Sequence, residues 1–261
     1  MKKVIALLII IICIVIAGIF MITGWGSNTP IINSSGEFLP PTTSLAEKIE
    51  IKSRTRNNES TRIHISTIWP EITNLPNYEK QEIINNKIAN SITPYIDEIS
   101  VVAEGITTIV HNDNIVDTKL YNYFVSYDRY NNDKYLSLIV NQDIRISVAG
   151  SDTGGLRSNK WKDIYNINCE TSDEVTLKDL CDFANYKSII VEEINKQAKN
   201  QQISLAGDYG LVDIPDSQRF YIKDGRLFIY FEPASIAPYL LGELDFEMPF
   251  RYNSSTGKFD R

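Results

Sequence analysis

Leu120–Val148 reads LYNYFVSYDRYNNDKYLSLIVNQDIRISV. Two runs in it, Leu120–Tyr130 and Tyr135–Val148, are rich in the aromatic and β-branched residues that favour strands. The runs meet at Asn131-Asn132-Asp133, and Asn and Asp tolerate the positive φ that tight hairpin turns require. The stretch therefore predicts an antiparallel hairpin.

A second hairpin is predicted closer to the N-terminus. Apolar and polar residues alternate from Lys48 and again from Ile63 to Ile68, with the turn-prone pair Asn57-Asn58 between them. We expect the hairpin to end near Trp69-Pro70. Pro76 then fits the first turn of a helix, because its fixed φ and missing N–H are tolerated there.

The predicted helix has one apolar face. Ile84, Ile88 and Ile92 recur four residues apart, the spacing that places side chains on the same side of an α-helix. Pro94 removes a donor and clashes with the preceding turn, so it is expected to end or kink the helix.

The C-terminal part alternates between helix and strand signals. Trp161–Asn168 predicts a strand, Thr176 predicts the cap of a short helix, and Tyr186–Gln201 predicts a longer one. Phe220–Ile222 and Arg226–Phe231 predict another hairpin, because they flank a Lys223-Asp224-Gly225 turn in which Gly supplies positive φ.

The last predicted strand is Glu243–Phe250. Glu243, Asp245 and Glu247 alternate with apolar residues, so the acids are expected to form a solvated face rather than a catalytic pair. Together these elements predict an α+β fold, with a mainly antiparallel sheet packed with two or three helices.

The N-terminus predicts a membrane anchor. Val4–Ile22 holds no charged residue, Lys2 and Lys3 precede it, and its length suffices for a helix to cross ~30 Å of hydrocarbon. We expect the following organisation: cytoplasmic stub 1–3, transmembrane helix 4–23, flexible stalk 24–47, and ectodomain halves 48–150 and 151–252. A cleaved signal peptide, with Gly24 or Gly26 near its cleavage site, is the alternative.

The net charge limits the classes of expected partner, and the cysteine content leaves one possible disulfide. Without Lys2 and Lys3 the exported part has 24 basic and 33 acidic side chains, a formal charge of −9. Nucleic acid and anionic membrane surfaces are therefore excluded as expected partners, whereas a cationic protein would be steered toward the domain. Cys169 and Cys181 either form a disulfide, which an extracytoplasmic location permits, or stay as two buried thiols.

A search for catalytic chemistry finds no motif. His64 and His111 are the two histidines, no zinc-ligand spacing occurs, and the serine-hydrolase elbow is absent. Gly150 and Gly155 have P-loop spacing, but Leu156 stands where the lysine is needed. No enzymatic activity, cofactor or metal is expected.

Two loops have the composition of contact surfaces. Asp152–Asn159 offers small polar residues and one arginine, so Asp152, Gly154, Gly155 and Arg157 are candidate ligand-binding residues. The second loop, Glu232–Gly242, contributes Pro238 and Tyr239, because a proline-stiffened aromatic loop loses little entropy on binding. In the alternative interpretation, Tyr239 and Ile236 fill the core.

Several segments resemble a known family. The chain resembles the extracytoplasmic domain of RsiV-type anti-sigma factors, which is shared with the accessory region of PdaC-type peptidoglycan deacetylases and catalogued as a domain of unknown function. The resemblance spans roughly residues 48–250 and rests on these segments: Phe220-Tyr221-Ile222, Leu227–Phe231, Ile236-Ala237-Pro238-Tyr239, Phe246–Phe250, Trp69-Pro70-Glu71-Ile72 and Val175–Leu180.

The resemblance implies a binding role outside the cell. RsiV-type members bind lysozyme there and hold a sigma factor inside. No sigma factor is expected here, since three residues precede the apolar run, and no deacetylase domain follows residue 250. Many relatives also have a histidine after the paired glycines, where this chain has Leu156.

We therefore expect a single-pass protein of the cell membrane, with an extracytoplasmic domain that binds lysozyme or a similar cationic protein. The alternative is an ancillary cell-wall module that binds peptidoglycan or assists another envelope protein.

Overall fold

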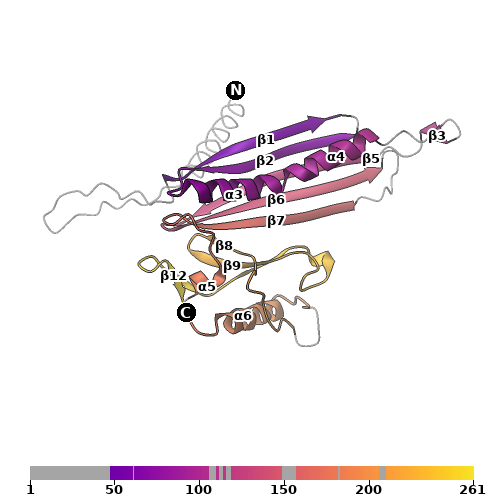
Figure 1. The fold of residues 1–261 in the computed structure, drawn as a ribbon. Coiled ribbons are helices and arrows are strands. Elements are labelled where there is room, and N and C mark those ends of the chain that lie inside the picture. Colours follow the sequence, from indigo (N-terminus) through magenta and orange to yellow (C-terminus); the bar gives the residue numbers. More distant parts are fainter. Residues whose placement is uncertain are drawn as a thin grey trace, which may run out of the picture. The chain divides into compact units, whose positions relative to one another are not determined.

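A computed structural model describes residues 48–60, 62–105, 110–111, 114–115, 119–148, 157–181, 183–205 and 210–261 (Figure 1). The expected transmembrane helix 4–23 and stalk 24–47 lie outside these residues. Within the described ranges, no helix is both long enough and apolar enough to cross a membrane.

The larger sheet has five strands in the order β1-β2-β5-β6-β7. Its strands are β1 (Glu50–Glu59), β2 (Ile63–Thr73), β5 (Lys119–Asn131), β6 (Tyr135–Val148) and β7 (Arg157–Asn168). All neighbours are antiparallel except β2 and β5, which run parallel. The predicted α+β class is confirmed, and the sheet is mixed.

The hairpin of β5 and β6 forms as the opening stretch predicts. Asn132 accepts at Oδ1 from the main-chain N–H groups of Lys134 (3.0 Å) and Tyr135 (2.8 Å), so its side chain organises the turn. Leu120 pairs with Ser147, close to the far end of both strands.

The first hairpin turns later than predicted. Asn57 and Asn58 lie inside β1, paired with Ser66 and Ile65, and the turn follows Glu59. The Asn57 side chain supports this pairing by accepting from Thr67 N–H at 3.0 Å. The Asn57 side chain thus contributes a hydrogen bond between β1 and β2, a role that the turn propensity of asparagine does not predict.

Pro70 lies within β2, although we expected the hairpin to end there. The parallel ladder between β2 and β5 covers only Ile63 to Thr67 on the β2 side. Beyond Thr67, β2 keeps β1 as its strand neighbour, so a residue without an N–H is tolerated at this position.

Two helices, α3 (Tyr78–Asn90) and α4 (Thr93–Gly105), connect the parallel strands. Asn77 caps α3 by accepting from Lys80 N–H at 3.0 Å, so Pro76 precedes the helix instead of lying in its first turn. Pro94 lies in the first turn of α4, which confirms that it interrupts the helix.

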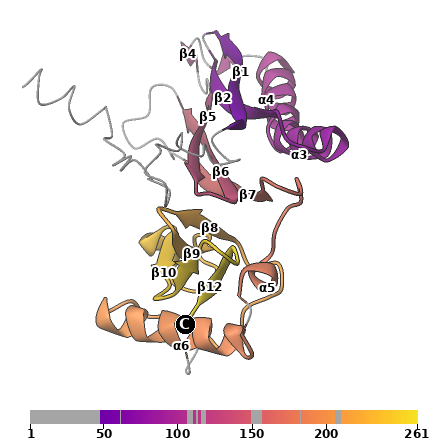
Figure 2. The ribbon, with the colours of Figure 1, turned by 90° about the vertical axis from the view of Figure 1, so that its left-hand side faces the viewer.

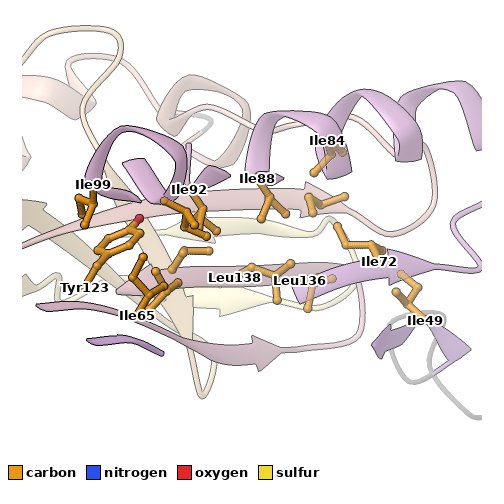
Figure 3. Close-up of a cluster of buried hydrophobic side chains, with 14 of the residues drawn as sticks. Ile49, Ile65, Ile72, Ile84, Ile88, Ile92, Ile99, Tyr123, Leu136 and Leu138 are labelled. Atoms are coloured by element: carbon orange, nitrogen blue, oxygen red, sulfur yellow. The ribbon is translucent and has the colours of Figure 1, made fainter. Parts of the chain in front are cut away.

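The helices cover one face of the sheet and enclose an aliphatic core (Figure 3). The predicted stripe of Ile84, Ile88 and Ile92 is buried, and Ile96 and Ile99 extend it along α4. These side chains meet strand residues that point to the same face, among them Ile65, Tyr123, Leu136 and Leu138.

The C-terminal part builds a second core around a three-stranded sheet of order β10-β9-β8 (Figure 2). The remaining elements are β3 (Val110–His111), β4 (Asn114–Ile115), α5 (Leu177–Leu180), α6 (Tyr186–Asn200), β8 (Phe220–Lys223), β9 (Arg226–Phe231), the 3-10 turn η1 (Tyr239–Leu241), β10 (Leu244–Glu247), β11 (Arg251–Asn253) and β12 (Lys258–Asp260). Ile190 and Ile194 of α6 pack into this core.

The predicted caps and turns of this part are confirmed. Thr176 and Asp179 form a reciprocal capping box at the start of α5. Asp224 and Gly225 both have positive φ, 51° and 71°, as a two-residue turn between β8 and β9 demands.

Strand pairing continues across the boundary expected at residue 150. β7 pairs with β6 along its length, so the larger sheet continues to Asn168. At the other end, β11 and β12 follow the strand that we expected to be last, and Phe259 is fully buried in the second core.

A buried polar network joins the two sheets. Ser137 Oγ donates to Asn166 Oδ1 (2.6 Å) and accepts from Ile222 N–H (3.0 Å), while Asn166 Nδ2 donates to Phe220 O (2.7 Å). Satisfied polar groups at this depth fix one arrangement of β8 against β6 and β7.

Cys169 and Cys181 are free thiols in the structure, and each is buried. Cys169 belongs to the first core and Cys181 to the second. This arrangement corresponds to the alternative of two buried thiols.

Candidate functional site

The free edge of β7 faces the segment 232–243, which connects β9 to β10. Only β6 pairs with β7 among the described strands. Tyr239 Oη donates to Ser158 O (3.2 Å), and Arg219 Nη1 donates to Lys162 O (2.9 Å). Two side chains thus occupy carbonyls that a further strand would use, which protects the edge from unwanted pairing.

The tip of this segment, η1, presents three apolar side chains to solvent. Tyr239 is 60% exposed, Leu240 96% and Leu241 46%. Pro238 fixes the entry to the turn, and its carbonyl accepts from Leu241 N–H at 3.0 Å. The tip is therefore a rigid, exposed apolar turn. Tyr239 and Ile236 were the two residues that could have filled the core, and only Ile236 packs against the second core.

The predicted site residues are only partly within the described part of the chain. Pro238 and Tyr239 belong to the tip. Asp152, Gly154 and Gly155 lie outside the described residues, and Arg157 is the first residue of β7, paired with Ile146.

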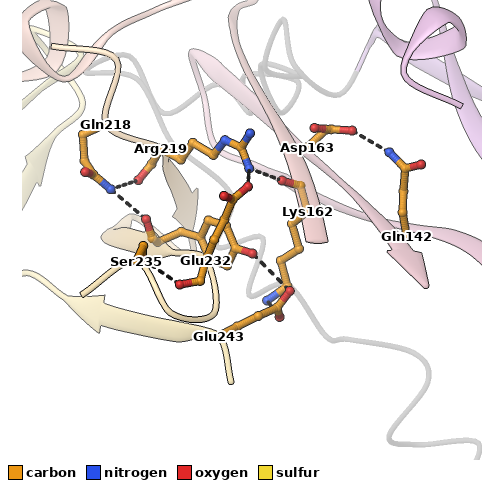
Figure 4. A network of polar contacts seen from close by, with 9 residues as sticks. Gln142, Lys162, Asp163, Gln218, Arg219, Glu232, Ser235 and Glu243 are labelled. Carbon is orange, nitrogen blue, oxygen red and sulfur yellow. Dashed lines mark hydrogen bonds and ion pairs between the residues drawn. The ribbon is translucent and has the colours of Figure 1, made fainter. Parts of the chain in front are cut away.

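A polar network fastens the tip-bearing segment to β7 (Figure 4). Arg219 Nη1, besides its bond to Lys162 O, forms an ion pair with Glu232. Ser235 Oγ donates to Glu232 O at 2.6 Å, which closes the turn after β9. Gln218 Nε2 donates to Tyr230 O at 2.7 Å.

Lys162 and the acids of β10 form a second attachment. Lys162 Nζ lies 2.7 Å from Glu243 Oε2, 3.7 Å from Asp245 Oδ2 and 5.0 Å from the ring centre of Tyr230. Tyr230 Oη donates to Glu243 Oε1 at 3.1 Å. Two of the three acids expected on a solvated face are thus engaged by Lys162 of the neighbouring sheet.

The surroundings of this attachment raise the pKa values of Asp245 and Tyr230. Burial raises the pKa of the Asp245 carboxyl, and Glu243 adds to this, although Lys162 acts in the opposite direction. Burial also raises the pKa of Tyr230, with the Glu243 carboxylate as a further cause. Alternation along β10 could not reveal these contacts, because Lys162 is far away in the sequence.

A hollow of about 460 Å³ opens beside the edge of β7. The rings of Tyr95 on α4 and Trp161 on β7 form one wall, with centroids 5.3 Å apart and an interplanar angle of 55°. Asp163, Arg219 and Glu232 supply polar groups, and Tyr239 lies at the boundary with the tip.

Asp163 is held by side chains that reach into the first core. Tyr123 is fully buried and donates from its hydroxyl to Gln142 Oε1, and Gln142 is 2% exposed. Gln142 Nε2 in turn donates to Asp163 Oδ2 at 2.6 Å (Figure 4). The sequence prediction missed Tyr95, Trp161 and Asp163, since only the packing of α4 on β7 brings them together.

The described residues do not form a metal centre. Nowhere in the described ranges do three or more His, Cys, Asp or Glu side chains gather in a way that could hold an ion. His64, 47% exposed, lies 5.4 Å from the Phe124 ring and 4.0 Å from Glu59. The arrangement at β7 offers binding surfaces: an apolar tip and an aromatic, polar hollow.

One protein-family model matches the C-terminal part of the chain. Residues 176–251 match the family described as "Protein of unknown function (DUF3298)". No curated protein sequence matches the chain.

Two solved structures of DUF3298 proteins match the chain. A DUF3298 family member from Bacteroides fragilis has 12% sequence identity and a TM-score of 0.50, covering 82% of this chain and 94% of its own. A DUF3298 family protein from Pseudomonas aeruginosa has 9% identity and a TM-score of 0.41, covering 81% and 94%. The chain thus shares the fold of the Bacteroides protein, and its residues 176–251 are similar to the DUF3298 domain.

Proposed function

We propose that this chain is an extracytoplasmic binding domain, anchored in a bacterial cell membrane by residues 4–23, whose ligand is a cationic protein of the lysozyme type. The observation that carries the proposal is the tip, where Tyr239, Leu240 and Leu241 expose apolar surface in consecutive positions. A soluble domain rarely exposes adjoining large apolar side chains unless they contact a partner.

The construction of the tip supports a contact role. Tyr239 is fixed by its bond to Ser158 O, Pro238 stiffens the backbone, and the Arg219–Glu232 pair holds the base of the segment. A rigid aromatic anchor loses little conformational entropy on binding, so more of its contact energy appears as affinity. Tyrosine is also among the residues that most often dominate interface energies.

The charge of the domain favours a basic partner. A formal charge of −9 over residues 27–261 attracts a cationic protein and accelerates its association at low ionic strength. The resemblance to RsiV-type domains, whose members bind lysozyme, supports the same class of ligand.

Binding is tested with the full-length chain in nanodiscs, titrated with hen egg-white lysozyme by calorimetry at low and physiological salt. We expect saturable binding that weakens as salt rises. Leu240→Ala and Tyr239→Ala should each weaken binding by more than about 1 kcal/mol without lowering the melting temperature. Val212→Ala is the matched control, since Val212 is 78% exposed and lies outside the tip.

Two results would count against this ligand. Absence of lysozyme binding in both buffers removes it, and equal losses for Leu240→Ala and Val212→Ala remove the tip as the contact. The location is tested separately: protease added to intact protoplasts should digest the domain while the protein stays in the membrane fraction.

Peptidoglycan is the second candidate ligand, and a different observation favours it. The hollow beside β7 brings together the rings of Tyr95 and Trp161, which the sequence alone did not connect. Ligands with an apolar face and a polar edge suit such a surface.

A further inference from the structure

We propose that the hollow beside β7 is a binding site for a neutral saccharide. The inference rests on the second candidate function and deepens it, because it assigns a small ligand to a hollow that shares only Tyr239 with the apolar tip. At about 460 Å³ the hollow falls within the range of ~300–1,000 Å³ typical of small-molecule sites.

The aromatic wall gives the site an apolar platform. Tyr95 keeps 39% of its surface exposed, and Trp161 is half-buried. Their rings meet at 55°, so they present two faces at an angle rather than one flat stack. A pyranose ring has an apolar face of C–H groups that can lie on such a platform, while its hydroxyls point outward.

Asp163 supplies a positioned acceptor on the same strand. Gln142 binds its Oδ2, and within the described ranges no hydrogen bond is made to Oδ1. Because Gln142 is itself fixed by the buried Tyr123 hydroxyl, the carboxylate is held in place before any ligand arrives. An ionised acceptor makes hydrogen bonds about twice as strong as a neutral one.

Donors come from Arg219 and Lys160. Arg219 uses Nη1 for its contacts with Lys162 O and Glu232, which leaves Nε and Nη2 without a partner among the described residues. Lys160 also lines the hollow and lies 3.7 Å from Asp143. The site therefore presents donors and acceptors together, as a ligand rich in hydroxyl groups requires.

Charge balance separates a saccharide from a charged ligand. The carboxylates of Asp163 and Glu232 are matched by the cations of Lys160 and Arg219, so the lining is formally neutral. A cation would face repulsion from Lys160 and Arg219, and an anion from Asp163 and Glu232. A neutral ligand with both donors and acceptors meets neither cost.

The test uses the full-length chain in nanodiscs with two neutral probes, cellobiose and N,N′-diacetylchitobiose, and one cationic probe, argininamide. Binding is followed by calorimetry and by ligand-observed NMR. We expect at least one neutral disaccharide to bind with saturation and argininamide to bind more weakly. Trp161→Ala and Asp163→Asn should each weaken saccharide binding about tenfold or more.

Controls keep the outcome independent of folding and of the protein ligand. Trp161→Phe preserves an aromatic face and should retain most of the affinity. The Asp163→Asn side chain can still accept a hydrogen bond from Gln142, so the melting temperature of this variant should stay near that of the parent. Leu240→Ala should leave saccharide affinity unchanged while it weakens lysozyme binding. Preference for argininamide, failure of both disaccharides to bind, or full affinity in a folded Asp163→Asn variant would overturn the proposal.

Discussion

The two cores of this domain are built from different residues. The first, under α3 and α4, is filled mainly by isoleucine, leucine and valine between strands of ten to fourteen residues. The second also holds isoleucine and leucine, but it adds five phenylalanines, namely Phe220, Phe231, Phe246, Phe250 and Phe259, between strands of three to six residues and turns of positive φ. Aliphatic residues of similar volume replace one another at small cost, whereas such turns accept few residue types.

The family match falls on one of the two cores. It covers residues 176–251, which supply most of the second core and its turns of positive φ. The candidate hollow, in contrast, takes Trp161 and Asp163 from the first sheet and Arg219, Glu232 and Tyr239 from the second part. A family match that covers only residues 176–251 therefore does not include all residues of the hollow.

The largest expected effect comes from truncating each core. Phe246→Ala should lower the free energy of unfolding by about 3–5 kcal/mol and Ile88→Ala by about 2–5 kcal/mol, because both side chains are almost completely buried. We expect one cooperative transition in urea, since Ser137 and Asn166 bind the second sheet to the first. Circular dichroism and tryptophan fluorescence should give the same midpoint.

Val212→Ala is the control for these truncations and should change stability by no more than about 0.5 kcal/mol. Two separate transitions, with Ile88→Ala shifting only one of them, would show that the cores fold independently.

The two thiols allow the cores to be compared in one protein. Burial raises the pKa of Cys169 and of Cys181 from 9.0 to about 12, so the thiolate fraction near neutral pH falls about 1,000-fold. Alkylation by iodoacetamide should therefore be slow in native protein and rapid in urea, as followed by mass spectrometry. Equal rates at the two cysteines are expected if the cores open together, and a faster rate at one would identify the weaker core.

Gly225→Ala probes the turns on which the second core depends. A residue with a Cβ at φ 71° should cost about 1–2 kcal/mol, and no steric clash adds to this because the nearest atom is 4.0 Å from the new Cβ. Asp224→Gly is the matched control, since glycine suits the φ of 51° at that position. A Gly225→Ala protein as stable as the parent in urea would exclude this account of the turn.

The smallest effect concerns Asp245, where the two parts meet. Because its folded pKa is raised, its contribution to stability is greatest below the unfolded value of 3.8 and is lost as the pH rises through the folded pKa. Asp245→Asn should thus be slightly more stable than the parent at pH 7, within about 0.5 kcal/mol, and equal to it at pH 3. Glu247→Gln, on the same strand, is the control in thermal melts across this range.

The sequence predicted local structure well where one signal acts alone. The Asn131-Asn132-Asp133 turn, the Asp224-Gly225 turn, the cap at Thr176 and the break at Pro94 all depend on the conformational preferences of the residues themselves. The prediction of a turn at Asn57-Asn58 was wrong. The strand register keeps Ile63 and Ile65 in the core, and in this register β1 continues through both asparagines to Glu59.

Long-range features were not accessible in this way. The parallel pairing of β2 with β5, the contact of Lys162 with the acids of β10, and the meeting of Tyr95 with Trp161 each join segments that are distant in the chain. No local preference encodes such pairs. The candidate site could therefore be predicted at the tip and not at the hollow.

The parallel pairing of β2 with β5 has a consequence for how the chain folds. Ile63 pairs with Tyr121, 58 positions later, and the helices α3 and α4 lie between them. Closing a loop of this length costs entropy before the pairing is gained, so topology makes this step slow compared with the hairpins. Until Tyr121 joins the fold, the edge of β2 that it covers stays unpaired, and for that interval the folding domain is most exposed to misassembly.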